Sequence, residues 1–181
     1  MLSSAFKLSA LVTLIGLGTV ACTTTPTETN TMIKDVDVHA VSTTGVGQKI
    51  GTIRFIDSPV GLAIQTNLTQ LPPGPHGFHI HEKGSCDEKE GKPVAALAAG
   101  GHFNPEKAPN HGTPLNGHMG DLPILNVDSA GNAKVNLLAP RLSLADVEGL
   151  AVMVHAGGDN YSDTPKPLGG GGDRIACGVI K

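Results

Sequence analysis

Residues 122–139 read LPILNV, then DSAGN, then AKVNLLA. Apolar and polar residues alternate along the two outer segments, and a period of two is typical of a half-buried β-strand. The five residues between them, 128–132, are turn formers and include Gly131. Two strand-like segments joined by so short a turn predict a β-hairpin in an antiparallel β protein.

Similar alternation recurs in short runs on both sides of this stretch. The clearest runs are Val36–Ala40, Lys49–Asp57, Val60–Leu68, Phe78–His81, Leu150–His155 and Arg174–Ile180. Together with the two segments above they predict an all-β domain of about eight strands, arranged as an antiparallel barrel or sandwich. One helical turn is expected at residues 143–146, where Ser143 and Asp146 have the form of a capping box.

Two long connections interrupt this pattern, at residues 82–119 and 156–173. Long connections without secondary structure of their own are usually functional. The first contains Cys86 and three histidines, and the second contains Asp159 and four consecutive glycines. We therefore expect these two loops to carry the functional site.

Composition limits the possible functions. The chain has 181 residues, a net charge of -3 and 3% aromatic residues, none of them Trp. This length fits one domain with a real core. A nucleic-acid-binding domain would be basic and would offer aromatic stacking platforms, so we expect no nucleic-acid partner.

The first 21 residues have the form of an export signal. Lys7 precedes an apolar run that is too short for a transmembrane helix. Cys22 suits a bacterial lipoprotein signal, although Thr19 stands where such signals usually carry Leu; ordinary cleavage after Ala21 is the alternative. Residues 22–32 are predicted to be a flexible tether, and residues 33–181 the mature domain.

Histidine is the most informative residue type, because six of the eight histidines lie between His76 and His118. His79 and His81 are two apart on a predicted strand and therefore face the same side. A third imidazole, His155, ends another apolar strand. Imidazole-rich sites of this kind suit Cu(II).

A second set of candidate ligands lies in the first long loop. His102 is followed by His111, His118 and Asp121, and three imidazoles with one carboxylate make a plausible tetrahedral zinc site. His102 would also complete the copper set if one ring nitrogen faced each metal, which requires the ring to be an imidazolate.

The sequence resembles the copper/zinc superoxide dismutases, specifically their exported bacterial branch. The resemblance rests on five segments that follow the family's order across residues 33–181. They are Gly77–His81, Gly101–Pro105, Gly117–Asp121, Val154–His155 and Gly172–Ile180. It implies a flattened eight-stranded Greek-key barrel with two metal-site loops, the cofactors copper and zinc, and a periplasmic location.

The resemblance also implies a role for each site residue. The copper ligands would be His79, His81, His102 and His155, and the zinc ligands His102, His111, His118 and Asp121. Asp159 would hydrogen-bond one ligand of each metal and fix the imidazole orientations. Arg174 would guide an anionic substrate to the copper.

The implied reaction is the disproportionation of superoxide to dioxygen and hydrogen peroxide by Cu(II)/Cu(I) cycling. In it, His102 is the bridging imidazolate and supplies one proton. Because the substrate is an anion and the protein is net negative, local focusing of charge at Arg174 must outweigh the overall charge. Such an enzyme provides antioxidant defence outside the cytoplasm.

The chain has three cysteines, Cys22, Cys86 and Cys177. Export permits a disulfide, and the resemblance implies the bridge Cys86–Cys177, which leaves Cys22 for lipid and membrane anchoring. Such a bridge would stabilise the fold by roughly 4–5 kcal/mol on the chain-entropy model. Two free thiols are the alternative.

Other classes would use similar residues. A non-catalytic periplasmic copper/zinc-binding protein would show the same ligands without turnover. A zinc hydrolase would need a general base near its ligands, and Glu82 would point to the opposite strand face. We interpret His39 and His76 as structural, and Lys89 and Lys92 as ordinary loop charges. The sequence leaves monomer and homodimer both open.

Overall fold

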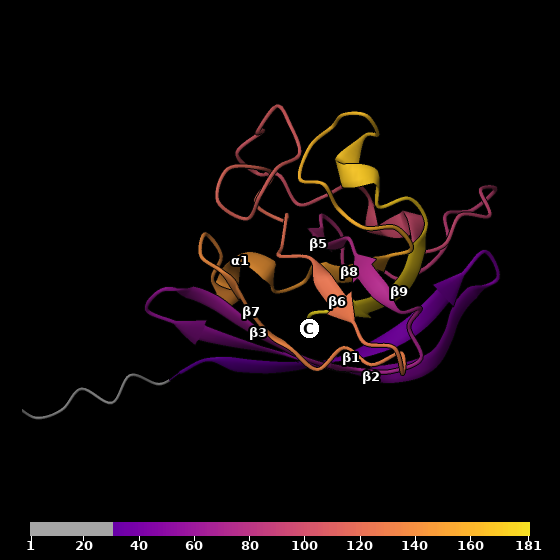
Figure 1. Cartoon of the computed structure of the whole chain (residues 1–181), viewed down its shortest axis with the longest axis horizontal. Coiled ribbons are helices and arrows are strands. Elements are labelled where there is room, and N and C mark those ends of the chain that lie inside the picture. The colour runs from indigo at the N-terminus through magenta and orange to yellow at the C-terminus, as the bar shows by residue number, and fades with distance from the viewer. Residues whose placement is uncertain (1–30) are drawn as a thin grey trace, which may run out of the picture.

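The computed structural model describes residues 31–181, which form nine strands, one α-helix and two short 3-10 turns (Figure 1). The elements are β1 (Ile33–Ser42), β2 (Gly45–Ser58), β3 (Gly61–Leu68), β4 (Gly74–His76), β5 (Phe78–His81), η1 (Leu97–Ala99), β6 (Leu125–Val127), β7 (Asn136–Ala139), α1 (Leu144–Val147), β8 (Ala151–His155), η2 (Leu168–Gly170) and β9 (Arg174–Val179).

Seven strands form one curled antiparallel sheet in the order β5-β8-β9-β1-β2-β3-β7, and β4 pairs with β6 in a small second sheet. The first and last strands are neighbours, because His39 pairs with Cys177 and Ala40 with Ala176. The all-β antiparallel fold expected from the sequence is confirmed. The strand that the sequence did not predict is β4, whose central residue Pro75 disfavours a strand assignment.

Alternation along the strands builds the core. In β3 the side chains of Leu62, Ile64 and Leu68 are fully buried and Thr66 is buried with them, whereas the alternate residues 63, 65 and 67 are more exposed. Phe55 of β2 lies opposite Ile64, and the register places both on the inner face. Burial of one face therefore fixes the register of these strands.

The hairpin predicted at residues 122–139 is wrong as a strand pairing. The turn itself forms, because Asp128 N–H donates to Asn132 O (2.8 Å) and Gly131 N–H donates to Asp128 O (3.0 Å). However, β6 pairs with β4, and β7 pairs with β3. The turn thus carries the chain from one sheet to the other, and pairing follows the burial of the apolar faces rather than sequence proximity.

The helical turn expected at residues 143–146 is confirmed as the start of α1. The Asp146 carboxylate accepts hydrogen bonds from Ser143 N–H (2.8 Å) and Ser143 Oγ–H (2.6 Å). Leu144 and Val147 of this turn are buried in the main core. The capping box and this burial together hold the short helix in place.

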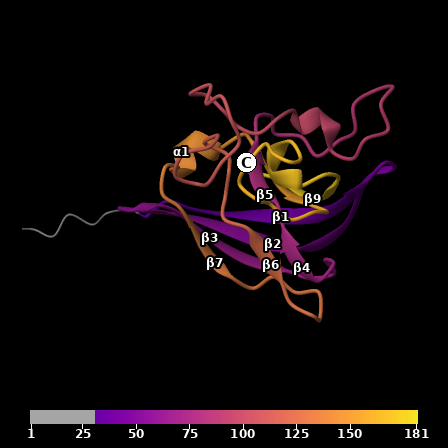
Figure 2. The ribbon, with the colours of Figure 1, turned by 45° about the horizontal axis from the view of Figure 1, so that its top comes forward.

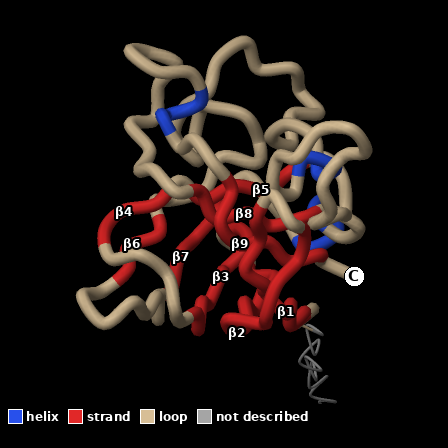
Figure 3. Tube along the Cα trace, turned by 90° about the vertical axis from the view of Figure 1, so that its right-hand side faces the viewer, coloured by secondary structure: helices blue, strands red, loops and turns tan. Residues whose placement is uncertain are grey.

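The two long connections lie on the side of the sheet that carries β5 and β8 (Figures 1 and 3). Residues 88–93 of the first connection also share a hollow with Thr43, in the turn between β1 and β2. The disulfide Cys86–Cys177 joins the first connection to β9 across 91 residues of sequence. A second apolar cluster surrounds it and includes Met153 of β8 and Ala96 and Ala99 of the loop. Disulfide and cluster together hold this loop against the sheet.

The predicted signal peptide, Cys22 and the tether up to residue 30 lie outside the described residues. The first strand begins at Ile33, close to where the domain was expected to begin (Figure 2). In the described part of the chain, no helix is long and apolar enough to cross a membrane.

Candidate metal centre

Two neighbouring strands present three histidines on one face. In the β5–β8 pair, His79 lies opposite Met153 and His81 opposite Ala151. Phe78 and Ile80 turn the other way into the main core, so the strand period places His79, His81 and His155 beneath the long loops. All three side chains are buried, with residue exposures of 6% or less.

The first long loop adds the other expected ligands to this face. Single bridges pair His81 with His102 and His79 with Asp121. A tight turn brings His118 and Asp121 together: Asp121 N–H donates to His118 O (3.1 Å), and the Asp121 carboxylate accepts from His118 N–H (2.8 Å). The spacing seen in the sequence therefore does bring both side chains to one place.

One group consists of His79, His81, His102 and His155, each offering one ligand atom within 4.8 Å of the others. His81 Nε2 and His155 Nε2 lie 3.3 Å apart. The other nitrogen of each of these two rings donates to a backbone carbonyl, Gly100 O (3.0 Å) and Gly172 O (3.1 Å) respectively. These bonds fix the tautomers and leave both Nε2 lone pairs free for a metal.

A second group of mutually close ligand atoms contains His79, His102, His111 and Asp121. The sequence prediction has His118 in place of His79. His79 Nε2 is occupied by Asp159, so this ring has one nitrogen left to offer, and that nitrogen already belongs to the first group. His118 Nδ1, 3.5 Å from Asp121 Oδ1, is the remaining imidazole nitrogen beside the second group.

Asp159 connects the two groups. Its Oδ2 accepts from His79 Nε2 and its Oδ1 accepts from His111 Nε2, both at 2.8 Å. Asp159 therefore contacts His79 and His111, the two rings that the resemblance assigns to different metals. With both Nε2 atoms engaged, His79 and His111 can offer only Nδ1 to a metal.

Unpaired nitrogens show that these residues fit metal ions. Among the described residues, three buried side-chain nitrogens or oxygens lack a hydrogen-bond partner: His79 Nδ1, His111 Nδ1 and His118 Nδ1. His111 Nδ1 and Asp121 Oδ1 lie 3.0 Å apart without the alignment of a hydrogen bond, as two atoms do when both face a shared ligand. Buried unpaired polar atoms are costly, and bound metal ions would satisfy all three.

Three rings of the first group, His79, His81 and His155, are electrostatically suited to remain neutral. Burial lowers the pKa of His79 to about 3 and that of His155 to about 4, and it lowers the pKa of His81 well below its ordinary value. Repulsion from His102 acts in the same direction. Neutral imidazoles keep the lone pairs that metal binding requires.

The second group carries carboxylates that stay ionised. Burial alone would raise the pKa of Asp121 and Asp159, but the neighbouring histidines outweigh it and lower both values. His102 and His111 act on Asp121, and His111 and His79 act on Asp159. Burial likewise acts to lower the pKa of His111, yet the two adjacent carboxylates, Asp121 and Asp159, raise that pKa to about 9. Two anions beside imidazoles suit a divalent cation.

Arg174 lies next to the first group. It pairs with His155 in the β8–β9 ladder, and its guanidinium donates to Ala96 O and Gly100 O, both at 2.5 Å. Its positive charge contributes to the lowered pKa of His81 and of His155. The structure thus brings a half-buried, fixed cation to the predicted copper ligands.

The remaining predicted residues lie apart from the cluster or support it. His76 is buried, and its ring nitrogens contact His155 O and Pro72 O at 2.7 Å, as expected for a structural role. His39 bonds only to Gly47 O (3.1 Å). Lys89 and Lys92 lie in an exposed part of the first loop.

Sequence reasoning missed two residues that hold the site together. Asp163 accepts from His111 N–H and Leu168 N–H, both at 3.0 Å, and so ties the two loops to each other. Gly169 has a φ of +71°, and a Cβ there would lie 2.0 Å from Asp159 Oδ1. The four-glycine run is a signal for such close backbone approach, but it does not reveal which carboxylate is approached.

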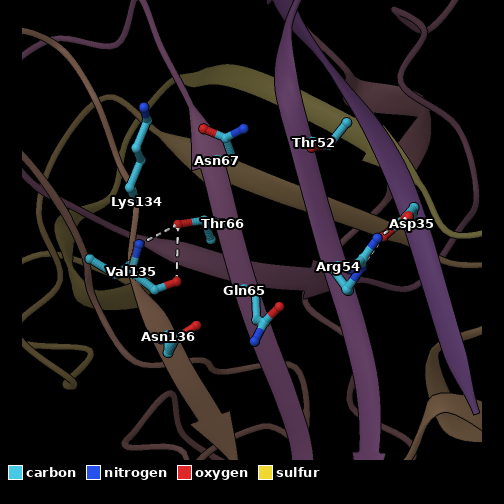
Figure 4. A pocket seen from close by; sticks show the side chains of 9 residues that line it. All are labelled: Asp35, Thr52, Arg54, Gln65, Thr66, Asn67, Lys134, Val135 and Asn136. Atoms are coloured by element: carbon cyan, nitrogen blue, oxygen red, sulfur yellow. Dashed lines mark hydrogen bonds and ion pairs between the residues drawn. The ribbon is translucent and has the colours of Figure 1, made fainter.

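A separate hollow lies on the outer face of β1, β2 and β3 (Figure 4). Two of its three charged residues, Asp35 and Arg54, pair with each other, because Arg54 Nε and Nη2 donate to the two Asp35 oxygens at 2.6 and 2.7 Å. None of the residues that line it belongs to the histidine cluster. The cluster, not this hollow, is therefore the candidate site.

Comparison with known proteins agrees with this geometry. Residues 49–180 match the copper/zinc superoxide dismutase family model. A curated copper/zinc superoxide dismutase of Escherichia coli (strain K12) is 52% identical over 150 residues, covering 81% of this chain and 87% of that protein.

Two solved structures are also similar. The copper/zinc superoxide dismutase from Brucella abortus has a TM-score of 0.79 and 47% identity, and the monomeric enzyme from Salmonella enterica has a TM-score of 0.74 and 51% identity. Each match covers 83% of this chain and 100% of the other. The chain therefore belongs to the copper/zinc superoxide dismutase family.

Proposed function

We propose that this protein converts two superoxide anions and two protons into dioxygen and hydrogen peroxide, with copper and zinc as cofactors. The observation that carries the proposal is the place of His102, the imidazole that belongs to both groups of close ligand atoms and has no bond to Asp159. A ring with one nitrogen toward each group can couple two metals. A simple metal carrier has no need for such coupling.

We assign His79, His81, His102 and His155 to copper, and His102, His111, His118 and Asp121 to zinc. When bound, copper supplies one-electron redox chemistry, and zinc supplies a fixed positive charge that holds the loop and tunes the shared imidazole. The protein's own groups set the geometry: Asp159, Gly100 O and Gly172 O orient four of the rings.

The reaction consumes two protons, and His102 is placed to hold one of them. Its Nδ1 lies 2.9 Å from Asp121 Oδ1, so Nε2, on the side of the first group, is the atom that can gain and lose a proton. Water supplies the second proton.

Arg174 provides the local positive charge that an anionic substrate needs. The protein has a net charge of -3, so attraction must arise near the site rather than from the whole molecule. Because two backbone carbonyls hold the guanidinium, its charge stays beside His81 and His155 and can draw superoxide to this place.

The test is superoxide consumption by residues 33–181 after loading with copper and zinc, with metal content measured on the same sample. Turnover that cyanide abolishes, with about one copper and one zinc per chain, is the expected result. Stoichiometric metal without turnover would favour a non-catalytic copper/zinc-binding protein.

We also propose that the protein is exported to the periplasm and anchored through lipid on Cys22. Two observations support this. Residues 1–21 have the form of an export signal, and the disulfide Cys86–Cys177 leaves Cys22 as the third cysteine, available for lipid. Fractionation of cells that express the full chain tests this: the wild-type protein should be found with membranes, and Cys22→Ser should be released. Equal distribution of both would contradict anchoring.

A further inference from the structure

One arginine outside the histidine cluster binds the backbone of the loop that carries His118. Arg141 follows the edge strand β7 and has a side chain that is 24% exposed. Its Nε donates to Pro114 O (2.9 Å), and its Nη2 donates to Gly117 O (2.8 Å) and His118 O (2.7 Å). All three acceptors lie within residues 114–118, a stretch that ends at His118.

These contacts are specific to the loop backbone. Among the described residues, Arg141 is the one hydrogen-bond donor to Pro114 O and to Gly117 O. A carboxylate, Glu106, lies nearby at 3.6 Å from Nη1, but it is exposed and contributes little. The planar guanidinium presents several donors in fixed directions, which suits a set of converging carbonyls better than an ammonium group would.

The position of Arg141 gives the loop a second attachment to the barrel. The disulfide holds the loop near its start, at Cys86, whereas Arg141 holds it near its end. His118 O also accepts from Asp121 N–H (3.1 Å), so the backbone on both sides of the His118 side chain is fixed. That side chain ends in a buried, unpaired Nδ1 at 3.5 Å from Asp121 Oδ1.

We infer that Arg141 is a positioning residue for zinc, which holds residues 114–118 so that His118 keeps Nδ1 beside Asp121. The inference rests on the zinc ligands proposed above. None of the atoms that Arg141 binds belongs to His79, His81 or His155. Loss of its hydrogen bonds should therefore weaken zinc retention and leave copper retention unchanged.

The experiment compares metal release from the copper- and zinc-loaded protein. Arg141→Met removes every donor but keeps most of the apolar stem, and Arg141→Lys keeps the charge without the planar donor set. Arg54→Met is the matched control, because Arg54 is an exposed arginine that pairs with Asp35 on the other face. Zinc and copper release to a chelator are followed separately, and the visible spectrum is recorded with Co²⁺ in the zinc site.

Zinc release from Arg141→Met should be roughly 10- to 100-fold faster than from wild type, as for other groups that support metal ligands. Arg141→Lys should lie between the two, and Arg54→Met should match wild type. The Co²⁺ bands should change in Arg141→Met alone. Copper release should stay the same in all variants.

Wild-type zinc release from folded Arg141→Met would overturn the inference, and so would equal acceleration of zinc and copper, which would show a general effect on the fold. If Arg141→Met does not fold, Arg141→Lys provides the same comparison. His118→Ala separates the two hypotheses: if it retains zinc as wild type does, the ligand assignment fails and the role of Arg141 in zinc binding fails with it. Rapid zinc loss from His118→Ala with wild-type release from Arg141→Met overturns the Arg141 inference alone.

Discussion

Arg54 and Asp35, on the outer face of β1 and β2, satisfy each other, whereas His79 and His118, beneath the long loops, each keep a buried ring nitrogen without a partner. Both regions are rich in polar side chains, and both rest on the same sheet; Figure 4 shows the outer one. The outer pair is exposed, so water screens it and its removal costs little. The inner nitrogens are buried, so a bound partner such as a metal ion is needed to satisfy them.

This difference distinguishes polar side chains that pair with each other from polar side chains that are left free to bind a ligand. At the site, a hydrogen bond satisfies one nitrogen of a ring and leaves the other free. Asp159, for example, binds Nε2 of His79 and of His111 and leaves Nδ1 of both rings unpaired. A buried polar group without a hydrogen-bond partner costs stability, and a bound ligand that pairs with it explains why it is there. Variants on the two faces should therefore differ sharply in their effects.

The largest effect is expected for His102→Ala, because this ring belongs to both groups of ligand atoms. Superoxide consumption should fall to background, and both metals should be bound more weakly. Activity with metal content on the same samples is the measurement, and His39→Ala, whose ring bonds only to Gly47 O, is the control. Substantial activity with both metals still bound would show that His102 is not shared.

Asp159→Asn should weaken both metals together. Asparagine has the same shape but offers one acceptor oxygen, so only one of the His79 and His111 rings keeps its partner, and the anionic charge is lost. Losses of roughly 10- to 100-fold in affinity are typical for such groups. Competition titrations with chelators measure this, with Asp35→Asn as the control on the outer face. Loss of one metal alone would argue against a connecting role.

Arg174→Ile should slow the reaction about tenfold at low salt without removing copper, because the local attraction for the anion is lost. The rate of the variant should also depend less on ionic strength than that of wild type. Stopped-flow rates over a range of salt concentrations test both points. An unchanged rate at low salt would remove Arg174 from the guiding role.

The structure brings the predicted candidate ligands close together, because each belongs to a local sequence pattern. His79 and His81 share a strand face, and His118 and Asp121 share a turn, so spacing alone places them in pairs. The segments that resemble the superoxide dismutase family then indicated which of these pairs would bind the same metal. The contact of Asp159 with one ring of each set followed from the same resemblance.

Long-range partners could not be predicted in this way. The turn at residues 128–132 was visible, but whether β6 and β7 pair with each other depends on which distant strands bury them. Arg141 escaped notice because it binds backbone carbonyls, which leave no residue pattern. Asp163 likewise binds only backbone N–H groups in the two loops.

The stability of the protein should also depend on pH after a chelator has removed its metals. His79 and His155 have folded pKa values of about 3 and about 4, below the ordinary 6.5. The unfolded chain therefore binds more protons below pH 6.5, and stability falls as the pH drops. The His111 pKa, raised to about 9, has the opposite sign, so its contribution is lost between pH 6.5 and 9. Urea midpoints from pH 5 to 10 should peak near neutrality, and a steady rise with pH would contradict these assignments.

The smallest effect is expected for Arg54→Leu on the outer face. The hydrogen bond from Arg54 lowers the pKa of Asp35, yet both side chains are about half exposed, and water can take the place of either partner. Metal content, superoxide consumption and zinc release should match wild type, and the urea midpoint should move little. A clear loss of metal in this variant would mean that the outer face is coupled to the site through the shared sheet. The contrast between screened outer pairs and unpaired inner nitrogens would then no longer explain where this protein is sensitive to substitution.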